Sequence, residues 1–220
     1  MRYLRIDTAL SEKFPGLSAQ LLRLENLHIK RRNQGLEELK EAVYSRIRER
    51  WSLDDLSSLP IFRAYRDFFW ELGIDPTKTR PASEALIRRV LHGNRIPQIN
   101  TLVDAYNLAS METAIPLAAF DQEMIQGELY MRGSKQGEAF LGIGMSEPII
   151  LEVDEIVVQD NDTLVAVYPY RDADKSKIST STQKAVVMVC GVPGVSSGRL
   201  MEAGKVAVDY ITRFCNGVVA

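Results

Sequence analysis

Hydrophobic positions recur at three- and four-residue steps early in the chain, beginning near position 36. The recurring residues are Leu36, Leu39, Val43, Ile47 and Trp51. This spacing places all five on one face of a helix, and glutamate, lysine and arginine residues occupy the opposite face. The pattern therefore predicts an amphipathic helix that buries one side against the rest of the protein.

Three further helices are predicted before position 116. Proline is favoured at the first position of a helix and glycine just after its last, so Pro60 and Gly73 bound the second helix. Its apolar face is largely aromatic, which is typical of core packing rather than of a base-stacking surface. The ranges 83–92 and 101–113 predict the third and fourth helices.

After position 116 the pattern changes from helical to extended. Short strands are predicted over 128–132, 139–143, 149–153 and 156–159. The apolar runs 164–167 and 185–190 are typical of central strands that are buried on both faces. A last helix is predicted over 200–214.

The order of these elements predicts an α+β (α/β-like) fold, with a mixed β-sheet core in one sheet system flanked by helices. At the N-terminal end, residues 1–30 are expected to form two short strands around a turn at Phe14-Pro15-Gly16. With the helix that follows, they form a segment, 1–58, that packs on a main domain, 59–220, as one compact unit.

Composition narrows the classes of function. The formal net charge is -2, so no global positive field attracts nucleic acid, and RNA binding depends on a local basic patch. Two cysteines, Cys190 and Cys215, and two histidines are too few for a disulfide framework or a zinc site, so neither a metal nor a cofactor is expected. The N-terminal residues lack a signal-like apolar run, and no stretch approaches the ~18 apolar residues of a membrane span. We therefore expect a cytoplasmic protein that does not bind a membrane.

A series of short motifs occurs in a fixed order in the middle of the chain. The motifs are V-D-x-x-N at 103–107, Glu112, P-L-A-A-F-D at 116–121, I-x-G at 125–127, Arg132, G-E at 137–138 and T-Q at 182–183. Their order and nearly ungapped spacing resemble the editing and tRNA-binding module of the phenylalanyl-tRNA synthetase beta subunit, over the range 61–189. Tyr65-Arg66, K-x-R-P at 78–81 and Arg88-Arg89 resemble the branch of that family in which the module occurs without an aminoacylation core.

The resemblance implies a partner and a chemistry. The partner is tRNA or aminoacyl-tRNA, and the process is translation. In the family, the module hydrolyses the ester of a tyrosine wrongly attached to tRNA, so an enzyme of this kind is an aminoacyl-tRNA ester hydrolase. The chain is not expected to attach amino acids to tRNA, because its remaining residues do not contain the class II synthetase motifs.

Four departures from the family concern the editing pocket, and one of them is a missing arginine, with Pro97 or Gln98 in its place. Ala118 stands where the family has the histidine of its P-L-H-A-F-D motif, and Met188 stands where it has the glutamate that reads the tyrosine hydroxyl. A buried hydroxyl needs a polar partner, which methionine does not supply. The glycine-rich loop of the family is replaced by Y-P-Y-R-D at 168–172. Recognition of tyrosine is therefore not expected, and the catalytic residues stay unassigned.

Two groups of residues are candidates for a ligand pocket. They are Asp104 and Asn107 on the fourth helix, and Tyr168, Tyr170, Arg171, Asp172, Asp174 and Lys175 in the replaced loop. The resemblance implies that the two groups flank one ligand, and we expect Asn107, Tyr170, Arg171 and Asp172 to line one cavity. The fork of Arg171 suits a carboxylate or phosphate, and Asp172 or Asp174 suits a water. Two alternatives stay open, a loop clamp for the helical pair and a solvated turn for the loop.

Basic residues cluster between positions 78 and 95. They are Lys78, Arg80, Arg88, Arg89 and Arg95, with Glu84 as the one acidic residue among them. Such a cluster binds RNA phosphates, or else it is a solvated helix face with internal ion pairs.

Two functions from different classes fit these observations. One is a tRNA-associated module that acts on an unidentified aminoacyl-tRNA as a separate deacylase. The other is a non-catalytic module that binds a small amino-acid-like ligand, with a protein-interaction domain as the fallback. The first is favoured if the basic cluster and the loop 168–175 lie together.

Overall fold

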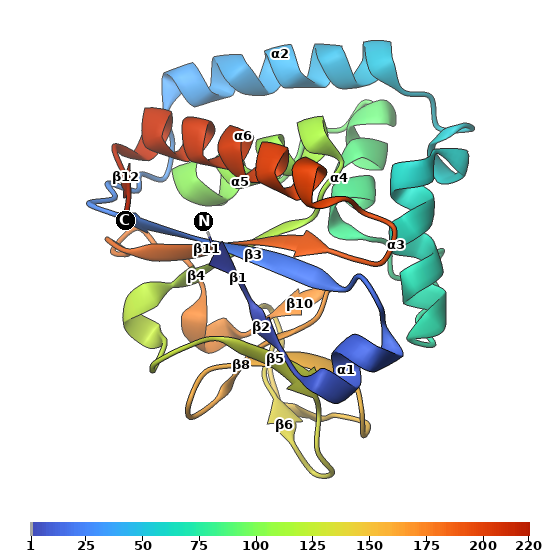
Figure 1. Cartoon of the computed structure of the whole chain (residues 1–220). Coiled ribbons are helices and arrows are strands. Elements are labelled where there is room, and N and C mark those ends of the chain that lie inside the picture. Colours follow the sequence, from blue (N-terminus) through green and yellow to red (C-terminus); the bar gives the residue numbers. More distant parts are fainter. Residues whose placement is uncertain (1) are drawn as a thin grey trace.

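The computed structural model describes residues 2–220 (Figure 1). The α-helices are α1 (Thr8–Lys13), α2 (Gln34–Arg50), α3 (Pro60–Glu71), α4 (Ala82–Leu91), α5 (Thr101–Thr113) and α6 (Ser197–Cys215). The strands are β1 (Arg2–Tyr3), β2 (Arg5–Ile6), β3 (Ser18–Glu25), β4 (Leu117–Asp121), β5 (Tyr130–Gly133), β6 (Ala139–Phe140), β7 (Ile149–Ile150), β8 (Ile156–Gln159), β9 (Leu164–Val167), β10 (Arg171–Asp172), β11 (Ala185–Gly191) and β12 (Val218–Val219).

The five longer helices form where the periodicity predicts them, and polar caps fix their starts. The side chain of Asn33 accepts a hydrogen bond from the Leu36 backbone N–H at the start of α2. Asn100 does the same for two backbone N–H groups of α5, and Ser196 caps α6. Each cap satisfies donors that the first turn of a helix leaves without partners.

The first sheet is the centre of the molecule. Its strand order is β1-β3-β11-β4, all pairs are antiparallel, and β12 also pairs with β3. The helices α5 and α6 lie over one face of this sheet, with α2 farther out (Figure 1). Every residue of β11 is buried, as the apolar run predicts. The division at position 58 stays a prediction, although β3 from the N-terminal segment lies between β1 and β11.

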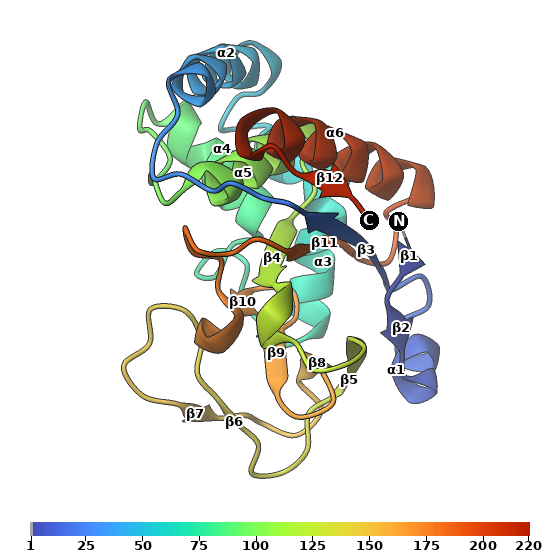
Figure 2. The ribbon, with the colours of Figure 1, turned by 90° about the vertical axis from the view of Figure 1, so that its left-hand side faces the viewer.

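A second sheet covers the other face of the first one (Figure 2). Its order is β10-β9-β8-β5-β2, and only the β2–β5 pair is parallel. The α+β class with a mixed sheet and flanking helices is therefore confirmed. The expectation of a single sheet system is wrong: the strands divide into two five-stranded sheets and a β6–β7 hairpin. A strand that is apolar on both sides needs a cover on each side, and here helices supply one cover and a second sheet the other.

The N-terminal region also differs from its prediction. Residues 1–30 contain the short helix α1 in addition to strands. Asp7 begins this helix by accepting a hydrogen bond from the Ala9 backbone N–H at 2.9 Å. A helix of six residues is too short to show a 3.6-residue repeat, so the pattern did not indicate it.

Candidate functional site

A small cavity lies where the first sheet meets the β9–β10 connection. Its volume is about 80 Å³. The lining residues are Ala82, Pro116, Leu117, Ala118, Ala166, Val167, Tyr168, Pro169, Tyr170, Arg171, Asp172, Met188 and Cys190. The cavity thus combines β4 and β11 from one sheet with β9 and β10 from the other.

Ala118 and Met188 form one wall of this cavity. They are direct partners in the antiparallel pairing of β4 with β11. Residues that lie opposite each other in such a pair place their side chains on the same face. The two positions that depart from the editing family are therefore neighbours, and they line the same cavity as the replaced loop.

Hydrogen bonds fix the loop side of the cavity. The Tyr168 hydroxyl donates to the Gly191 backbone oxygen at 2.7 Å, and the Tyr65 hydroxyl donates to the Cys190 backbone oxygen at 2.6 Å. Both tyrosines are fully buried. The end of β11 is therefore tied to the loop on one side and to α3 on the other.

Asp172 is the carboxylate of the cavity. Within residues 2–220, no donor lies within hydrogen-bond distance of its side-chain oxygens, and burial raises its pKa from 3.8 to about 7. Burial, and then the charge of Asp172, raise the pKa of the half-buried Tyr106 and of the Cys190 thiol. The thiol therefore stays protonated, while Asp172 titrates near neutral pH.

Arg171 lies at the mouth of the cavity and is exposed. Its aliphatic stem packs over Gly142, and a Cβ added at Gly142 would collide with the Cδ and Cγ atoms of the arginine. In the described part of the chain, no carboxylate lies within ion-pair distance of its guanidinium. The guanidinium is therefore available to an anionic ligand.

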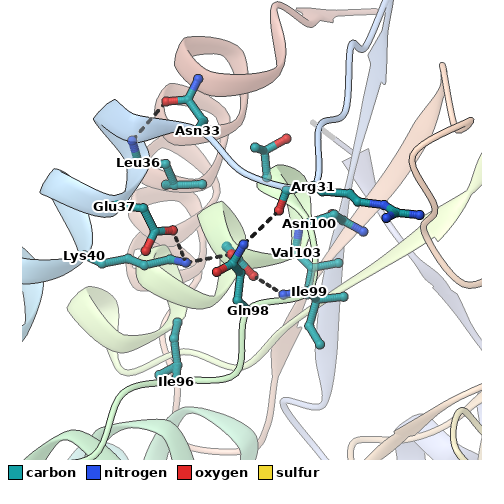
Figure 3. A network of polar contacts seen from close by, with 12 residues as sticks. Arg31, Asn33, Leu36, Glu37, Lys40, Ile96, Gln98, Ile99, Asn100 and Val103 are labelled. Atoms are coloured by element: carbon teal, nitrogen blue, oxygen red, sulfur yellow. Dashed lines mark hydrogen bonds and ion pairs between the residues drawn. The ribbon is translucent and has the colours of Figure 1, made fainter.

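The two helical candidates do not line the cavity. The Asp104 carboxylate is buried and accepts a hydrogen bond from Lys40 Nζ at 2.7 Å and one from the Ile99 backbone N–H at 2.9 Å (Figure 3). Lys40 also donates to Glu37 at 2.8 Å. Asp104 therefore joins α2, α5 and the connection before α5. This is the role of a loop clamp, which the sequence left open as the alternative to a ligand site. Asn107 is half-buried, and it is not among the lining residues.

Asp174 and Lys175 belong to a surface turn. Asp174 pairs with Lys177 at 2.8 Å, and Lys175 donates to the Thr163 hydroxyl at 3.2 Å. Of the two acidic residues considered for positioning a water, only Asp172 lines the cavity.

The motif residues outside the cavity hold segments together. The Thr182 hydroxyl donates to Asp121 at 2.5 Å, and Arg132 pairs with Glu138 at 2.5 Å. The first contact joins two segments that are distant in the sequence, and the second fixes the turn after β5, so these four motif residues have structural roles.

Four of the five basic candidates share a second, open hollow of about 390 Å³. Its lining is Lys78, Arg80, Ala85, Arg88, Arg89, His92 and Asn94. Arg95 does not line it and instead pairs with Glu41 on α2. Among residues 2–220, no carboxylate lies within ion-pair distance of Lys78, Arg80 or Arg89, which leaves their charges uncompensated.

Arg88 has a different role at the edge of this basic hollow. Its Nε atom donates to the fully buried Glu84 carboxylate at 2.7 Å, and Arg66 pairs with the same carboxylate at 3.0 Å. The nearby Ser83 hydroxyl donates to the Ala114 backbone oxygen, so it is not free for a phosphate. Arg88 therefore neutralises a buried charge, and internal ion pairing accounts for part of the cluster.

The cavity and the basic hollow meet at the start of α4. Arg80 lines the hollow and Ala82 lines the cavity, and both residues are exposed. Two residues span at most about 7 Å of chain, so the two sites are adjacent. Ala82 and Cys190 were not identified from the sequence as lining residues, because small and apolar residues carry no chemical signal and only the fold brings them here.

No helix among residues 2–220 has the length and apolar character that crossing a membrane requires. Within the same residues, no group of three or more histidine, cysteine, aspartate or glutamate side chains is arranged to hold a metal ion.

Comparison with known proteins finds relatives among aminoacyl-tRNA ligase subunits. The chain is similar to phenylalanine–tRNA ligase beta subunits: 27% identical over 148 residues in Methylococcus capsulatus, 31% over 125 residues in Vibrio parahaemolyticus and 28% over 100 residues in Ureaplasma parvum. These alignments cover 66%, 56% and 46% of this chain, but only 18%, 15% and 13% of those proteins. The chain therefore corresponds to a small part of the relatives that it matches.

The fold has a counterpart among solved structures. An N-terminal fragment of the phenylalanyl-tRNA synthetase beta subunit from Pyrococcus horikoshii superposes with a TM-score of 0.52 at 12% identity, over 98% of this chain and 49% of the fragment. The model of the B3/4 domain family matches residues 64–218. That match covers more than half of the chain and includes the cavity and the basic hollow, so the chain belongs to the B3/4 domain family, whose module it shares with the synthetase beta subunit.

Proposed function

We propose that this protein binds the acceptor end of an aminoacyl-tRNA, with RNA phosphates in the basic hollow and the amino-acid side chain in the cavity. The observation that carries the proposal is the junction of the two sites at Arg80 and Ala82. A strand end bound in the hollow needs to extend only a short distance to reach the cavity. The proposal implies a role in translation and a cytoplasmic location.

The charges support a modest, local RNA contact. The protein as a whole is slightly acidic, so attraction is confined to the uncompensated Lys78, Arg80 and Arg89 and to the remaining donors of Arg88. For a single strand, neutralising three or four phosphates gives a slope of log affinity against log salt of about -2 to -3. Binding should therefore be weak and strongly salt-dependent.

Asp172 supports hydrolysis as the reaction of the bound ester. A base works best when its pKa is near the working pH, and burial raises that of Asp172 to about 7. In this step the carboxylate accepts a proton from a water whose oxygen attacks the ester carbonyl carbon. The bond from that carbon to the ribose oxygen breaks, and the ribose oxygen takes the proton.

A second candidate is a non-catalytic module for a free amino-acid-like ligand. The observation in its favour is that Arg171 and Asp172 bring opposite charges to one small cavity. A zwitterion pairs with both, without any RNA.

One panel of measurements separates the two functions. Aminoacyl-tRNAs, uncharged tRNA and free amino acids are incubated with the protein, and binding and ester loss are both measured. We expect aminoacyl-tRNA to bind more tightly than uncharged tRNA, and the variant with Arg80→Ala and Arg89→Ala to lose most of this affinity. The matched control is Arg95→Ala, because this exposed arginine lies outside the hollow. Binding of free amino acids without any preference for the charged RNA contradicts the proposal.

A further inference from the structure

The enclosed part of the cavity is smaller than an aromatic ring requires. Its volume is about 80 Å³. Water occupies about 30 Å³ per molecule in the liquid, and an apolar cavity of about 150 Å³ accommodates benzene. The space in this protein therefore suits a side chain of roughly two or three heavy atoms.

The walls resist widening. Met188 lies in the central strand β11 and is 1% exposed, and Ala118 opposite it is 6% exposed. On the loop side, the Tyr168 hydroxyl donates a hydrogen bond to the Gly191 backbone oxygen. Expansion toward either side must displace a packed strand or leave a buried carbonyl without its donor.

Two charged groups line the cavity, Arg171 at its mouth and Asp172. Leu117, Ala118, Ala166 and Met188 make an apolar wall, and the Asp172 carboxylate faces this space without a donor of its own. Asp172 is half-buried, and a carboxylate that has lost part of its hydration gains from a ligand that brings a hydrogen-bond donor.

We infer that the cavity selects a small aminoacyl group whose side chain carries a hydroxyl, of the size of serine or threonine, with that hydroxyl donating to Asp172. The inference rests on the proposed function, in which the cavity holds the side chain of the aminoacyl group. A carboxylate has two oxygens, so one accepts the ligand hydroxyl while the other remains for a water. A site that hydrogen-bonds a substrate hydroxyl discriminates strongly against an analogue that lacks the hydroxyl. A purely apolar pocket discriminates only weakly between the same two ligands.

The test uses stable analogues, 3′-aminoacylamino-3′-deoxyadenosines, titrated calorimetrically into the full chain. The analogues carry seryl, threonyl, alanyl, phenylalanyl and tyrosyl groups. We expect the seryl and threonyl analogues to bind at least tenfold more tightly than the alanyl analogue, and the two aromatic ones to show no measurable binding. Tighter binding of an aromatic analogue overturns the size argument, and equal binding of seryl and alanyl analogues overturns the role of the hydroxyl.

Two variants test the assignment of Asp172. Asp172→Asn keeps the shape of the side chain and should reduce the seryl preference over alanyl to about threefold or less. A merely structural role would instead weaken all analogues equally. Asp174→Asn, outside the cavity, is the matched control and should leave the preference unchanged.

Binding of charged and uncharged tRNA to the natural protein distinguishes a failure of this inference from a failure of the proposed function. If seryl-tRNA and phenylalanyl-tRNA bind no better than uncharged tRNA, the proposed function fails and the inference fails with it. If phenylalanyl-tRNA is preferred, the proposed function stands and only the inference is wrong.

Discussion

The buried ion pair between Lys40 and Asp104 should be a major contributor to stability, and Lys40→Met tests this. The substitution leaves the Asp104 carboxylate, which is 2% exposed, with the Ile99 backbone N–H as its one remaining donor among residues 2–220. Removing one partner of a buried pair costs about 3–5 kcal/mol. For a protein of this length, each kcal/mol shifts the melting temperature by about 2–4 °C, so the loss should be roughly 6–20 °C.

The measurement is urea denaturation followed by circular dichroism, with Arg48→Met as the control. Arg48 is an exposed cation on the same helix, and its loss should change the free energy of unfolding by less than about 0.5 kcal/mol. The double variant Lys40→Met with Asp104→Leu replaces both charges by apolar groups, so it should regain most of the lost stability. A change of less than about 1 kcal/mol for Lys40→Met would refute the clamp and return Asp104 to the candidates for a ligand site.

The ion pair also predicts a dependence on alkaline pH. Burial disfavours the charged lysine, but hydrogen bonds to Asp104 and Glu37 outweigh this effect and raise the pKa of Lys40 above 10.5. The stabilisation is therefore fully present below the ordinary pKa of lysine and is lost as the pH rises through the raised value.

Three further predictions concern the cavity. The protein should not release tyrosine from tyrosyl-tRNA(Phe), because Ala118 and Met188 offer no polar partner to the ring hydroxyl; rapid release in a filter assay with labelled tyrosine would contradict this. Arg171 lies at the mouth of the cavity, so Arg171→Ala should weaken binding of a ligand whose carboxylate or phosphate reaches it by about tenfold or more, with nearly unchanged melting temperature. Gly142→Val, which displaces the arginine stem, should reproduce the effect in the same titration. Because burial raises the pKa of Asp172 from 3.8 to about 7, the folded state holds this proton more tightly than the unfolded chain, so stability should fall as the pH rises from about 4 to 7. Asp172→Asn should therefore be more stable than the natural protein at pH 8 but not at pH 4, and equal urea midpoints for the two proteins at pH 8 would count against the burial of this carboxyl.

The five longer helices could be predicted because each spans enough residues to show a repeat of apolar positions. The range of α5 follows from its repeat, whereas α1 and the division of strands between two sheets depend on contacts that no local pattern encodes. The same contrast holds in the cavity. The loop residues Tyr170 to Asp172 were identified by their unusual chemistry, but the pairing of Ala118 with Met188 is a matter of strand register. Asp104 and Asp172 are both aspartates in segments that the sequence marks as candidate sites. The buried ion pair with Lys40, which the sequence does not indicate, gives Asp104 a structural role instead.

The direct pairing of Ala118 with Met188 has a consequence for the evolution of this fold. Two side chains that face each other across adjacent strands share one volume, so a larger residue at one position requires a smaller one at the other. Changes of ligand preference by single substitutions at these positions should therefore often cost folding, and intermediates between specificities should be rare. A laboratory library that varies positions 118 and 188 together, with the loop 168–172 held constant, should reach new specificities that neither position reaches alone.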